Sequence, residues 1–243
     1  DAAKKVGINI PTLCYHEDLS VKAMCRLCVV EVVGARTLQA ACSQPVSAGM
    51  QIITNSPAVR QARKMNLELL LSNHPDDCLN CVRNQRCELQ SLADQLGIGE
   101  QRFGSLTKPN YPKDESTAAL VRDPDKCILC RRCVEVCHEV QSVGAIAPAN
   151  RGINTQILPA GGVDLNDVAC VQCGQCALVC PVGAIYEQDH TERVWAALAD
   201  PDKHVVVQTA PAIRVSIGEE FGLEPGQVAT GKLVAALRRL GFD

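Results

Sequence analysis

Aromatic residues are scarce in this sequence: Phe, Tyr and Trp together make up 3% of its 243 residues. Few large rings are therefore available to fill a single large core. The hydrophobic fraction of 47% includes 15 cysteines and many alanines, so burial is spread thinly. Because bound metal supplies stability that a large core would otherwise supply, we expect several small metal-binding modules rather than one large domain.

Other features are missing, and each absence excludes a class of protein. No apolar run approaches the roughly 18 residues of a membrane span, and residues 1–13 lack the apolar core of a signal peptide. The formal charge is -3 with scattered basic residues, which argues against nucleic-acid binding. Neither a G-x-G-x-x-G loop nor a P-loop occurs, so we expect no nucleotide site. These absences predict a cytoplasmic protein whose thiols stay reduced.

The cysteines that are present form an ordered pattern. Two runs repeat C-x2-C-x2-C-x3-C, the spacing of paired four-iron clusters, in which the fourth cysteine, at the start of a helix, binds the cluster of the other run. One cluster is then expected at Cys127, Cys130, Cys133 and Cys180, and the other at Cys170, Cys173, Cys176 and Cys137. Zinc ribbons, which use paired C-x2-C motifs, and disulfides, which need an oxidising compartment, are the less favoured alternatives.

The two runs differ at their ends. The second ends in Cys180-Pro181, whereas the first ends in Cys137-His138. The first run therefore lacks the proline that would stop a helix from running back through the loop.

A looser cysteine pattern precedes these runs. Its spacing, C-x10-C-x2-C-x13-C, resembles that of plant-type two-iron sites, with Cys14, Cys25, Cys28 and Cys42 as ligands. The valine-rich residues 27–33 predict a buried strand after Cys28. Residues 1–6 predict the end of a helix closed by Gly7, and we expect that strands preceding it are missing from this sequence. Unrelated buried cysteines remain the alternative.

The middle of the chain is predicted to be helical. Ser56 is a good N-cap and Pro57 suits the first helical position, with Val59, Ala62, Met65 and Leu69 at helical spacing up to about residues 72–73. Residues 108–125, rich in proline and charge, predict a linker. The 32 residues between the two cysteine runs predict a plain hairpin rather than a docking insertion, with a turn at Gly161-Gly162.

A fourth motif, H-x3-C-x2-C-x5-C, follows the predicted helix. Its members are His74, Cys78, Cys81 and Cys87. A histidine beside a proline is often a surface or capping residue, and three cysteines with a histidine also suit zinc. The other sites use all but three of the 15 cysteines, so adding His74 completes four sets of four ligands. This count favours His74 as a cluster ligand.

The order of these sites resembles the N-terminal half of iron-only hydrogenase large subunits, and the first two sites also resemble the large iron-sulfur subunit of complex I and some formate dehydrogenases. Residues 205–243 resemble the opening of the catalytic H-cluster domain, especially in NAD(P)-linked multi-subunit types. From the residues alone, this tail predicts a strand and two helices, with Thr230 capping the last helix and Gly241 ending it.

This resemblance implies an α+β fold of small iron-sulfur modules in series. These are a truncated β-grasp two-iron ferredoxin-like domain (1–55), a helical four-iron module with one histidine and three cysteines as ligands (56–122), a double four-iron ferredoxin-like domain (123–190) and the start of an α/β hydrogenase domain (191–243). The implied cofactors are one 2Fe-2S cluster and three 4Fe-4S clusters. An H-cluster is expected only if the chain continues beyond Asp243, because the family's catalytic cysteines lie downstream and no cysteine follows Cys180.

The implied function is an electron relay between an H-cluster and a flavin- and NAD(P)-binding partner subunit that carries FMN. A thioredoxin-like iron-sulfur subunit is a second implied partner and ferredoxin a further candidate. By itself, the segment cannot make or split hydrogen; we favour a catalytic domain that has been left out over a shortened relative. The alternative is a non-catalytic electron-transfer subunit of a transhydrogenase, formate dehydrogenase or complex I-like assembly.

Overall fold

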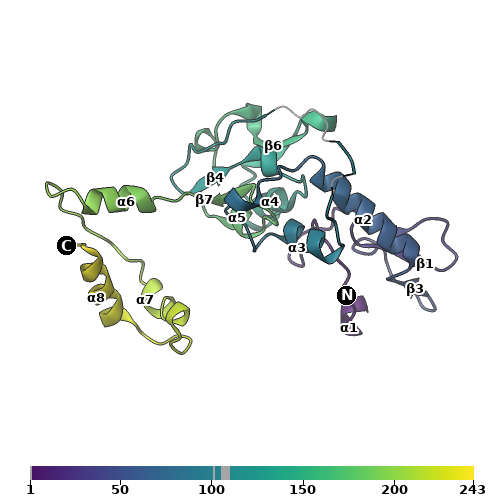
Figure 1. The fold of residues 1–243 in the computed structure, drawn as a ribbon, viewed down its shortest axis with the longest axis horizontal. Coiled ribbons are helices and arrows are strands. Elements are labelled where there is room, and N and C mark those ends of the chain that lie inside the picture. Colours follow the sequence, from purple (N-terminus) through teal and green to yellow (C-terminus); the bar gives the residue numbers. More distant parts are fainter. Residues whose placement is uncertain (1, 101, 105–109) are drawn as a thin grey trace. The chain divides into compact units, whose positions relative to one another are not determined.

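The computed structural model describes residues 2–100, 102–104 and 110–243 and divides into two compact units, Asp1–Gln188 and Asp189–Asp243 (Figure 1). The first unit contains helices α1 (Ala2–Lys5), α2 (Pro57–Leu71), α3 (Glu88–Gln95), α4 (Arg132–Glu135) and α5 (Gln175–Leu178). Its strands are β1 (Val29–Val32), β2 (Gln39–Ala40), β3 (Ile52–Ile53), β4 (Leu120–Arg122), β5 (Ile146–Ala149), β6 (Gln156–Pro159) and β7 (Ile185–Glu187). The fold mixes helices with short strands, and among the described residues no helix has the length and apolar character to cross a bilayer.

The N-terminal strands form a small antiparallel sheet in the order β2-β1-β3. The strand predicted at residues 27–33 is β1, at the centre of this sheet. Only its first half, Val29 and Val30, is buried, whereas Glu31 and Val32 are half-buried. The helix predicted before Gly7 is α1, and Gly7 itself has a positive φ of 74°.

Helix α2 begins and ends where its capping residues predict. The Val59 N–H donates to Ser56 Oγ at 3.2 Å, and Pro57 is the first helical residue. The buried face differs from the spacing set out above, because Met65 and Leu69 are exposed. The side chains that α2 buries are Val59, Arg63, Leu67 and Glu68. This face is selected by packing against β1, where Arg63 Nη2 donates to the Val29 carbonyl at 2.8 Å.

Two pairs of strands belong to the double-run region, which is the part of the chain that contains the cysteine runs at residues 127–137 and 170–180. Strand β4, before the first run, pairs antiparallel with β7, after the second run, so the two ends of this region lie together. Strands β5 and β6 form the predicted hairpin between the runs. Its turn contains a 3-10 helix, Gly152–Asn154, whereas Gly161 and Gly162 follow β6.

The proposed linker, residues 108–125, is only partly a connection. It contains β4, which is paired within the double-run region, and Asp114 forms a bridge with Arg122. Lys108 and Pro109 lie outside the described residues. The boundaries of the four expected segments stay predictions.

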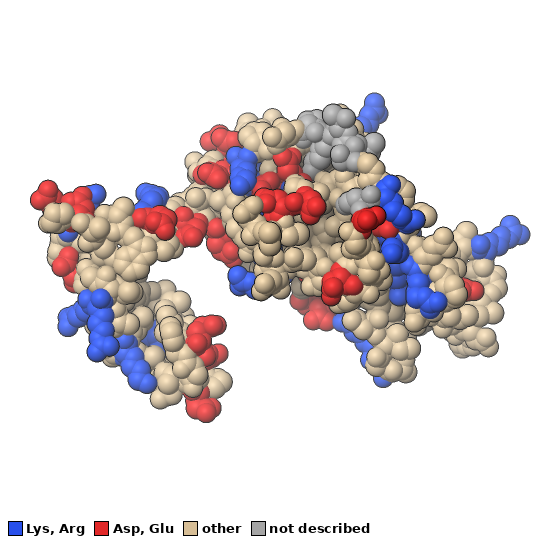
Figure 2. All heavy atoms as spheres, viewed as in Figure 1, with Lys and Arg blue, Asp and Glu red and all other residues tan. Residues whose placement is uncertain are grey.

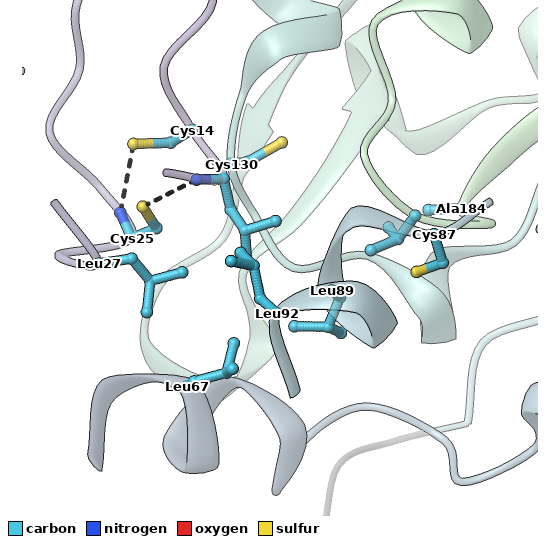
Figure 3. Close-up of a cluster of buried hydrophobic side chains, with 11 residues drawn as sticks. Cys14, Cys25, Leu27, Leu67, Cys87, Leu89, Leu92, Cys130 and Ala184 are labelled. Carbon is cyan, nitrogen blue, oxygen red and sulfur yellow. Dashed lines mark hydrogen bonds between the residues drawn. The ribbon is translucent and has the colours of Figure 1, made fainter. Parts of the chain in front are cut away.

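The main core joins segments that are far apart in the sequence. One cluster of buried side chains contains Leu13, Cys14, Cys25, Leu27, Leu67, Cys87, Leu89, Leu92, Cys130, Val182 and Ala184 (Figure 3). Cysteines of three different motifs therefore share one apolar interior. A second cluster lies between the two strand pairs and includes Cys133.

The second unit contains α6 (Thr191–Leu198), α7 (Ile213–Ser216) and α8 (Thr230–Leu240). The strand expected from Val205 is absent from the described residues, since residues 203–210 have no strand assignment and this unit offers no strand for them to pair with. The expected cap was also wrong: Thr230 is the first residue of α8, and the N-cap position is Ala229. Gly241, with φ of 104°, ends α8 as predicted.

Candidate metal centres

The four N-terminal cysteines gather at one end of the β2-β1-β3 sheet. Cys28 precedes β1 and Cys42 follows β2, and the antiparallel pairing of these strands brings the two cysteines to the same end. The Cys25 N–H donates to Cys14 Sγ at 3.4 Å (Figure 3). All four residues of the proposed two-iron site are thus brought together by one sheet and its two flanking loops.

Hydrogen bonding and burial raise the pKa values of two of these thiols and lower the pKa of a third. The hydrogen bond from the Cys14 thiol lowers the pKa of Cys25 to about 5. The same bond raises the pKa of Cys14 above its ordinary value. Burial, followed by a hydrogen bond with Cys28, raises the pKa of Cys42 to about 12. Since metal ligands are thiolates, binding of iron at this site would displace protons from the thiols.

The three cysteines of the middle motif lie on a tight connection between α2 and α3. Cys78 begins a 3-10 helix, Cys78–Asn80, and the Cys81 N–H donates to the Cys78 carbonyl at 3.2 Å. Cys87 occupies the N-cap of α3. Burial is the main cause that raises the pKa values of Cys78 and Cys87, and the charge of Cys81 raises both further. The three thiols are therefore close enough to interact.

His74 lies just beyond the end of α2. Its backbone N–H donates to the Leu71 carbonyl at 3.0 Å, and its side chain is half-buried. The residue is on the same connection as the three cysteines. Its role as the fourth ligand stays a prediction.

The middle motif packs against the segment that follows the second cysteine run. The Glu88 N–H and the Cys87 thiol both donate to the Pro181 carbonyl, at 3.0 Å and 3.7 Å. A Cβ atom placed on Gly183 would lie 2.7 Å from Cys81 Sγ. Two cysteines of the middle motif thus contact the backbone beside the double-run sites.

The double-run cysteines are arranged as two crossed sets. A cavity of about 310 Å³ is lined by Cys127, Cys130 and Cys133 of the first run and by Cys180 of the second. The charges that act on the Cys176 thiol come from Cys170, Cys173 and Cys137. Burial raises the pKa of Cys130 to about 12 and that of Cys176 to about 11. Each set thus contains three thiols of one run and the last thiol of the other.

The two runs repeat one unusual backbone conformation. The angle φ is positive at the same two positions of each run, namely Leu129 (57°), Arg131 (66°), Gln172 (52°) and Gly174 (77°). The Leu129 N–H donates to Cys127 Sγ, and the Gln172 N–H donates to Cys170 Sγ, both at 3.4 Å. A left-handed residue costs roughly 1–2 kcal/mol for non-glycine side chains, and such turns aim successive N–H groups at an anionic group. This geometry suits a negatively charged, thiolate-bound cluster.

The two runs end differently, for the reason that their sequences indicate. Helix α4 contains Cys133 and continues into a π-helical turn, Val136–Val140, which contains Cys137. Helix α5 stops at Leu178, before Cys180-Pro181. Proline has no N–H and blocks the preceding turn, whereas the first run lacks this block. The expectation that the fourth cysteine starts a helix was wrong, because Cys137 lies within the π-helical turn that continues α4 and Cys180 lies beyond the end of α5.

Two buried donors support a bound group at these sites. Arg63 Nε and Arg132 Nε are both buried and find no acceptor among the described residues. Arg63 is close enough to Cys28 for their charges to interact, and Arg132 to Cys130. Unsatisfied buried donors cost about 1–3 kcal/mol each. The thiolate sets and these donors together fit iron-sulfur clusters.

The alternatives fare less well. None of the 15 cysteines forms a disulfide, so the disulfide alternative is wrong. Within the described ranges, no group of three or more His, Cys, Asp or Glu side chains is arranged to hold a metal ion. Zinc needs its ligands about 2.0–2.3 Å from one point, whereas a cluster is surrounded by more widely spaced thiolates. The cysteine sets therefore fit clusters better than single zinc ions.

Arg132 is a site residue that the sequence patterns did not single out. Its guanidinium donates to both Glu88 carboxylate oxygens, at 2.7 Å and 2.9 Å, to the Tyr15 carbonyl at 2.9 Å and to the Val179 carbonyl at 3.5 Å. The available signal was its position inside a cysteine run, directly before Cys133.

Figure 2 shows where charged side chains lie on one face of the molecule: Lys and Arg gather over α2, and acidic side chains are interspersed elsewhere. Among the described residues several charges are paired in the interior, including Arg122 with Asp114 at 3.1 Å. Asp114 also accepts from the Leu165 N–H at 3.0 Å, and this ties the segment before β4 to the double-run region.

Four family models match successive parts of the chain. They are the 2Fe-2S iron-sulfur cluster binding domain (residues 1–57), the NADH-ubiquinone oxidoreductase-G iron-sulfur binding region (63–102), the 4Fe-4S dicluster domain (126–184) and the C-terminal domain of the iron only hydrogenase large subunit (203–243). The fold is therefore a series of small iron-sulfur domains of the 2Fe-2S and 4Fe-4S kinds.

Three relatives show how far the similarity extends. The NADP-reducing hydrogenase subunit HndD of Solidesulfovibrio fructosivorans is 50% identical over 248 residues, covering 100% of this chain and 42% of that protein. Iron hydrogenase 1 of Clostridium pasteurianum is 37% identical, covering 99% and 42%. The G 2 subunit of NADH-quinone oxidoreductase from Rhizobium meliloti is 38% identical, covering 83% and 23%. The chain thus spans less than half the length of these relatives.

A solved structure agrees with these relatives. A chain in the crystal structure of NAD+-reducing [NiFe]-hydrogenase in the H2-reduced state matches with a TM-score of 0.71 and 34% identity. The match covers 77% of this chain and 79% of that chain.

Proposed function

Because this chain belongs to the iron-sulfur region of the NAD(P)-linked, iron-only hydrogenase large subunits, we propose that it conducts electrons through four bound clusters. The same region is related also to the G-type subunits of NADH-quinone oxidoreductase. When bound, thiolate-ligated iron exchanges single electrons with little rearrangement. The observation that carries the proposal is the crossed pairing of the two cysteine runs, since three thiols of one run and the last of the other line one cavity.

We assign the ligands by their grouping. Cys14, Cys25, Cys28 and Cys42 would hold a 2Fe-2S cluster in a truncated β-grasp domain. Three 4Fe-4S clusters would be held by His74, Cys78, Cys81 and Cys87, by Cys127, Cys130, Cys133 and Cys180, and by Cys170, Cys173, Cys176 and Cys137. Each group is supported by the contacts among its thiols, except that His74 rests on spacing and on the exhausted cysteine count.

The contacts between groups support a branched relay. Cys130 shares its buried cluster with Cys14 and Cys25 on one side and with Cys87 on another (Figure 3). Cys133, of the same set as Cys130, is close enough to Cys176 for their charges to interact. The set around Cys130 thus adjoins all three other sets. It would be the junction where two entry branches meet before the last site.

The chain's own groups would tune each site. Backbone N–H groups donate to the sulfur atoms of Cys14, Cys25, Cys127, Cys137 and Cys170. Hydrogen bonds to sulfur, burial and net charge set the reduction potential of such sites. A neutral imidazole from His74 would make its site less negative and easier to reduce than an all-cysteine site, which suits an entry point.

The activity of the whole protein is a wider proposal. Residues 203–243 match the start of the iron-only hydrogenase catalytic domain, which supports an H-cluster domain downstream of Asp243. The enzyme would then couple hydrogen oxidation or evolution to NAD(P) through a flavin-binding partner subunit that carries FMN. A thioredoxin-like iron-sulfur subunit and ferredoxin are further proposed partners. A cytoplasmic location is part of this proposal, because thiols stay reduced there and available to metal.

A second candidate has its own support. The similarity to the G 2 subunit of NADH-quinone oxidoreductase covers 83% of the chain, so a non-catalytic relay subunit would use the same cluster sites. Residues 203–243 separate the two candidates, because the hydrogenase interpretation alone assigns this segment to a catalytic domain.

Metal analysis of anaerobically purified protein tests the relay. We expect about 14 iron atoms per chain, two from the N-terminal site and four from each other site. Reduction should produce one two-iron and three four-iron signals in electron paramagnetic resonance. Stoichiometric zinc in well-loaded protein, or only two four-iron signals, would contradict the assignment of the middle motif.

A further inference from the structure

The side chain of Arg132 is buried where three of the cysteine sets meet. It is 6% exposed and makes a two-pronged ion pair with Glu88. Its Nη2 also donates to the Tyr15 carbonyl, and Nη1 lies 3.5 Å from the Val179 carbonyl. The sequence distance to Tyr15 is 117 residues, and the distance to Glu88 is 44. One planar group therefore joins three separate segments of the chain.

Each partner of Arg132 is the neighbour of a proposed ligand. Tyr15 follows Cys14 of the N-terminal set, and Glu88 follows Cys87 of the middle set. Val179 precedes Cys180, and Arg132 itself precedes Cys133, both in the junction set around Cys130. A single peptide bond separates each anchored residue from a ligand residue in the chain. Displacement of the guanidinium would therefore shift ligand residues of three sites together.

The chemistry of arginine is suited to this task. Its rigid fork binds a carboxylate through two parallel hydrogen bonds and still has donors for carbonyl groups, whereas lysine offers a point charge on a flexible stem. The cluster spacing does not itself require arginine there, because Gln175 occupies the equivalent position in the second run. The arginine therefore has a role beyond completing the C-x2-C-x2-C loop.

We propose that Arg132 is a positioning residue that holds the N-terminal, middle and junction sites at fixed separations. Its charge also offsets that of Glu88, whose side chain is 47% exposed, so its loss removes a buried positive charge beside the junction. The proposal rests on the cluster assignment above. It makes one guanidinium responsible for the geometry of the branch point.

The test compares two variants in the cluster-loaded chain. Arg132→Gln removes both fork and charge, and Arg132→Lys keeps the charge alone. The readouts are the distances and magnetic coupling between reduced clusters, from pulsed electron paramagnetic resonance, and the midpoint potential of each cluster. Arg36→Gln, at an exposed arginine, is the matched control for loss of one positive charge.

We expect Arg132→Gln to broaden the distances between the N-terminal and junction clusters and to lower the junction potential. Arg132→Lys should restore the potential but not the distances, since lysine lacks the fork. A general loss of stability would lower the unfolding temperature, but it would not make Arg132→Lys recover the potential while the distances stay changed. Arg36→Gln should leave both readouts unchanged.

Unchanged distances and coupling in Arg132→Gln would overturn the proposal. If that variant fails to assemble its clusters, Glu88→Gln decides: it weakens the two-pronged bond while keeping Arg132, and normal distances in it would equally overturn the proposal. The parent protein separates this failure from a failure of the cluster assignment. If the unmutated protein assembles four clusters and the distances between them do not change in the variants, only the proposed role of Arg132 is rejected.

Discussion

The thiol of Cys81 lies against the backbone of Gly183, so closely that a Cβ atom on Gly183 would sit 2.7 Å from Cys81 Sγ. The two residues belong to different motifs and are brought together by the packing of the middle motif on the segment after Cys180. Lys126 and Arg83 side chains are the next neighbours of this position, at 3.6 Å and 3.7 Å. Gly183 is thus required for space, because it carries no unusual positive φ.

The first prediction concerns this close approach. Gly183→Ala should displace Cys81 and reduce iron content by about four atoms per chain, since a ligand held by a cluster cannot move aside freely. Metal analysis and the loss of one four-iron signal measure the effect. Gly99→Ala is the control, because a Cβ there meets nothing within 4 Å. Full iron loading of Gly183→Ala would show that Cys81 is not held in place as a ligand.

The second prediction tests the crossed sets by a double-mutant cycle. Cys180→Ser and Cys130→Ser should each disturb the same cluster, so the double variant should lose no more signal than either single variant. Cys180→Ser combined with Cys173→Ser should instead disturb two clusters. Quantified four-iron signals measure both pairs. The reverse pattern, in which Cys180 and Cys173 act as one unit, would mean that each run holds its own cluster.

A third prediction concerns His74, whose ligand role rests on spacing. His74→Cys should keep the middle cluster and lower its midpoint potential, because a fourth thiolate adds negative charge and stabilises the oxidised state. Redox titration with electron paramagnetic resonance gives the potential of each cluster. The other three clusters serve as internal controls and should be unchanged. If no potential moves, His74 is a bystander and the site is completed by another group.

The fourth prediction concerns metal and folding. Iron removal by a chelator should greatly increase hydrogen exchange across residues 127–180, because α4 and α5 are only four residues long and depend on the sites that they flank. The unit Asp189–Asp243 contains no cysteine and provides the control: α8 should exchange at the same rate with or without iron. Retained protection at residues 127–180 in metal-free protein would show that a protein core, not metal, stabilises this region.

Local features of this chain were well predicted. Ser56, Pro57 and Gly241 mark helix ends through interactions with residues one turn away, and the long spacer between the runs forms the predicted hairpin, although Gly161 and Gly162 follow β6 and do not form its turn. Distant packing decided which face of the predicted helix is buried. Met65 and Leu69 fall at helical spacing but are exposed, because the position of β1 selects the face with Arg63 and Leu67.

The sequence by itself determined the sets of candidate ligands, because the cysteines that bind a four-iron cluster from one loop have short, regular spacings along the chain. Only the tertiary structure decided how the sets adjoin one another. The contact of Cys81 with Gly183, the interior shared by Cys14, Cys87 and Cys130, and the anchoring of Tyr15 by Arg132 join segments that are up to 117 residues apart. Such contacts leave no periodic trace in a sequence, since they depend on where whole strands and helices pack rather than on spacing along the chain.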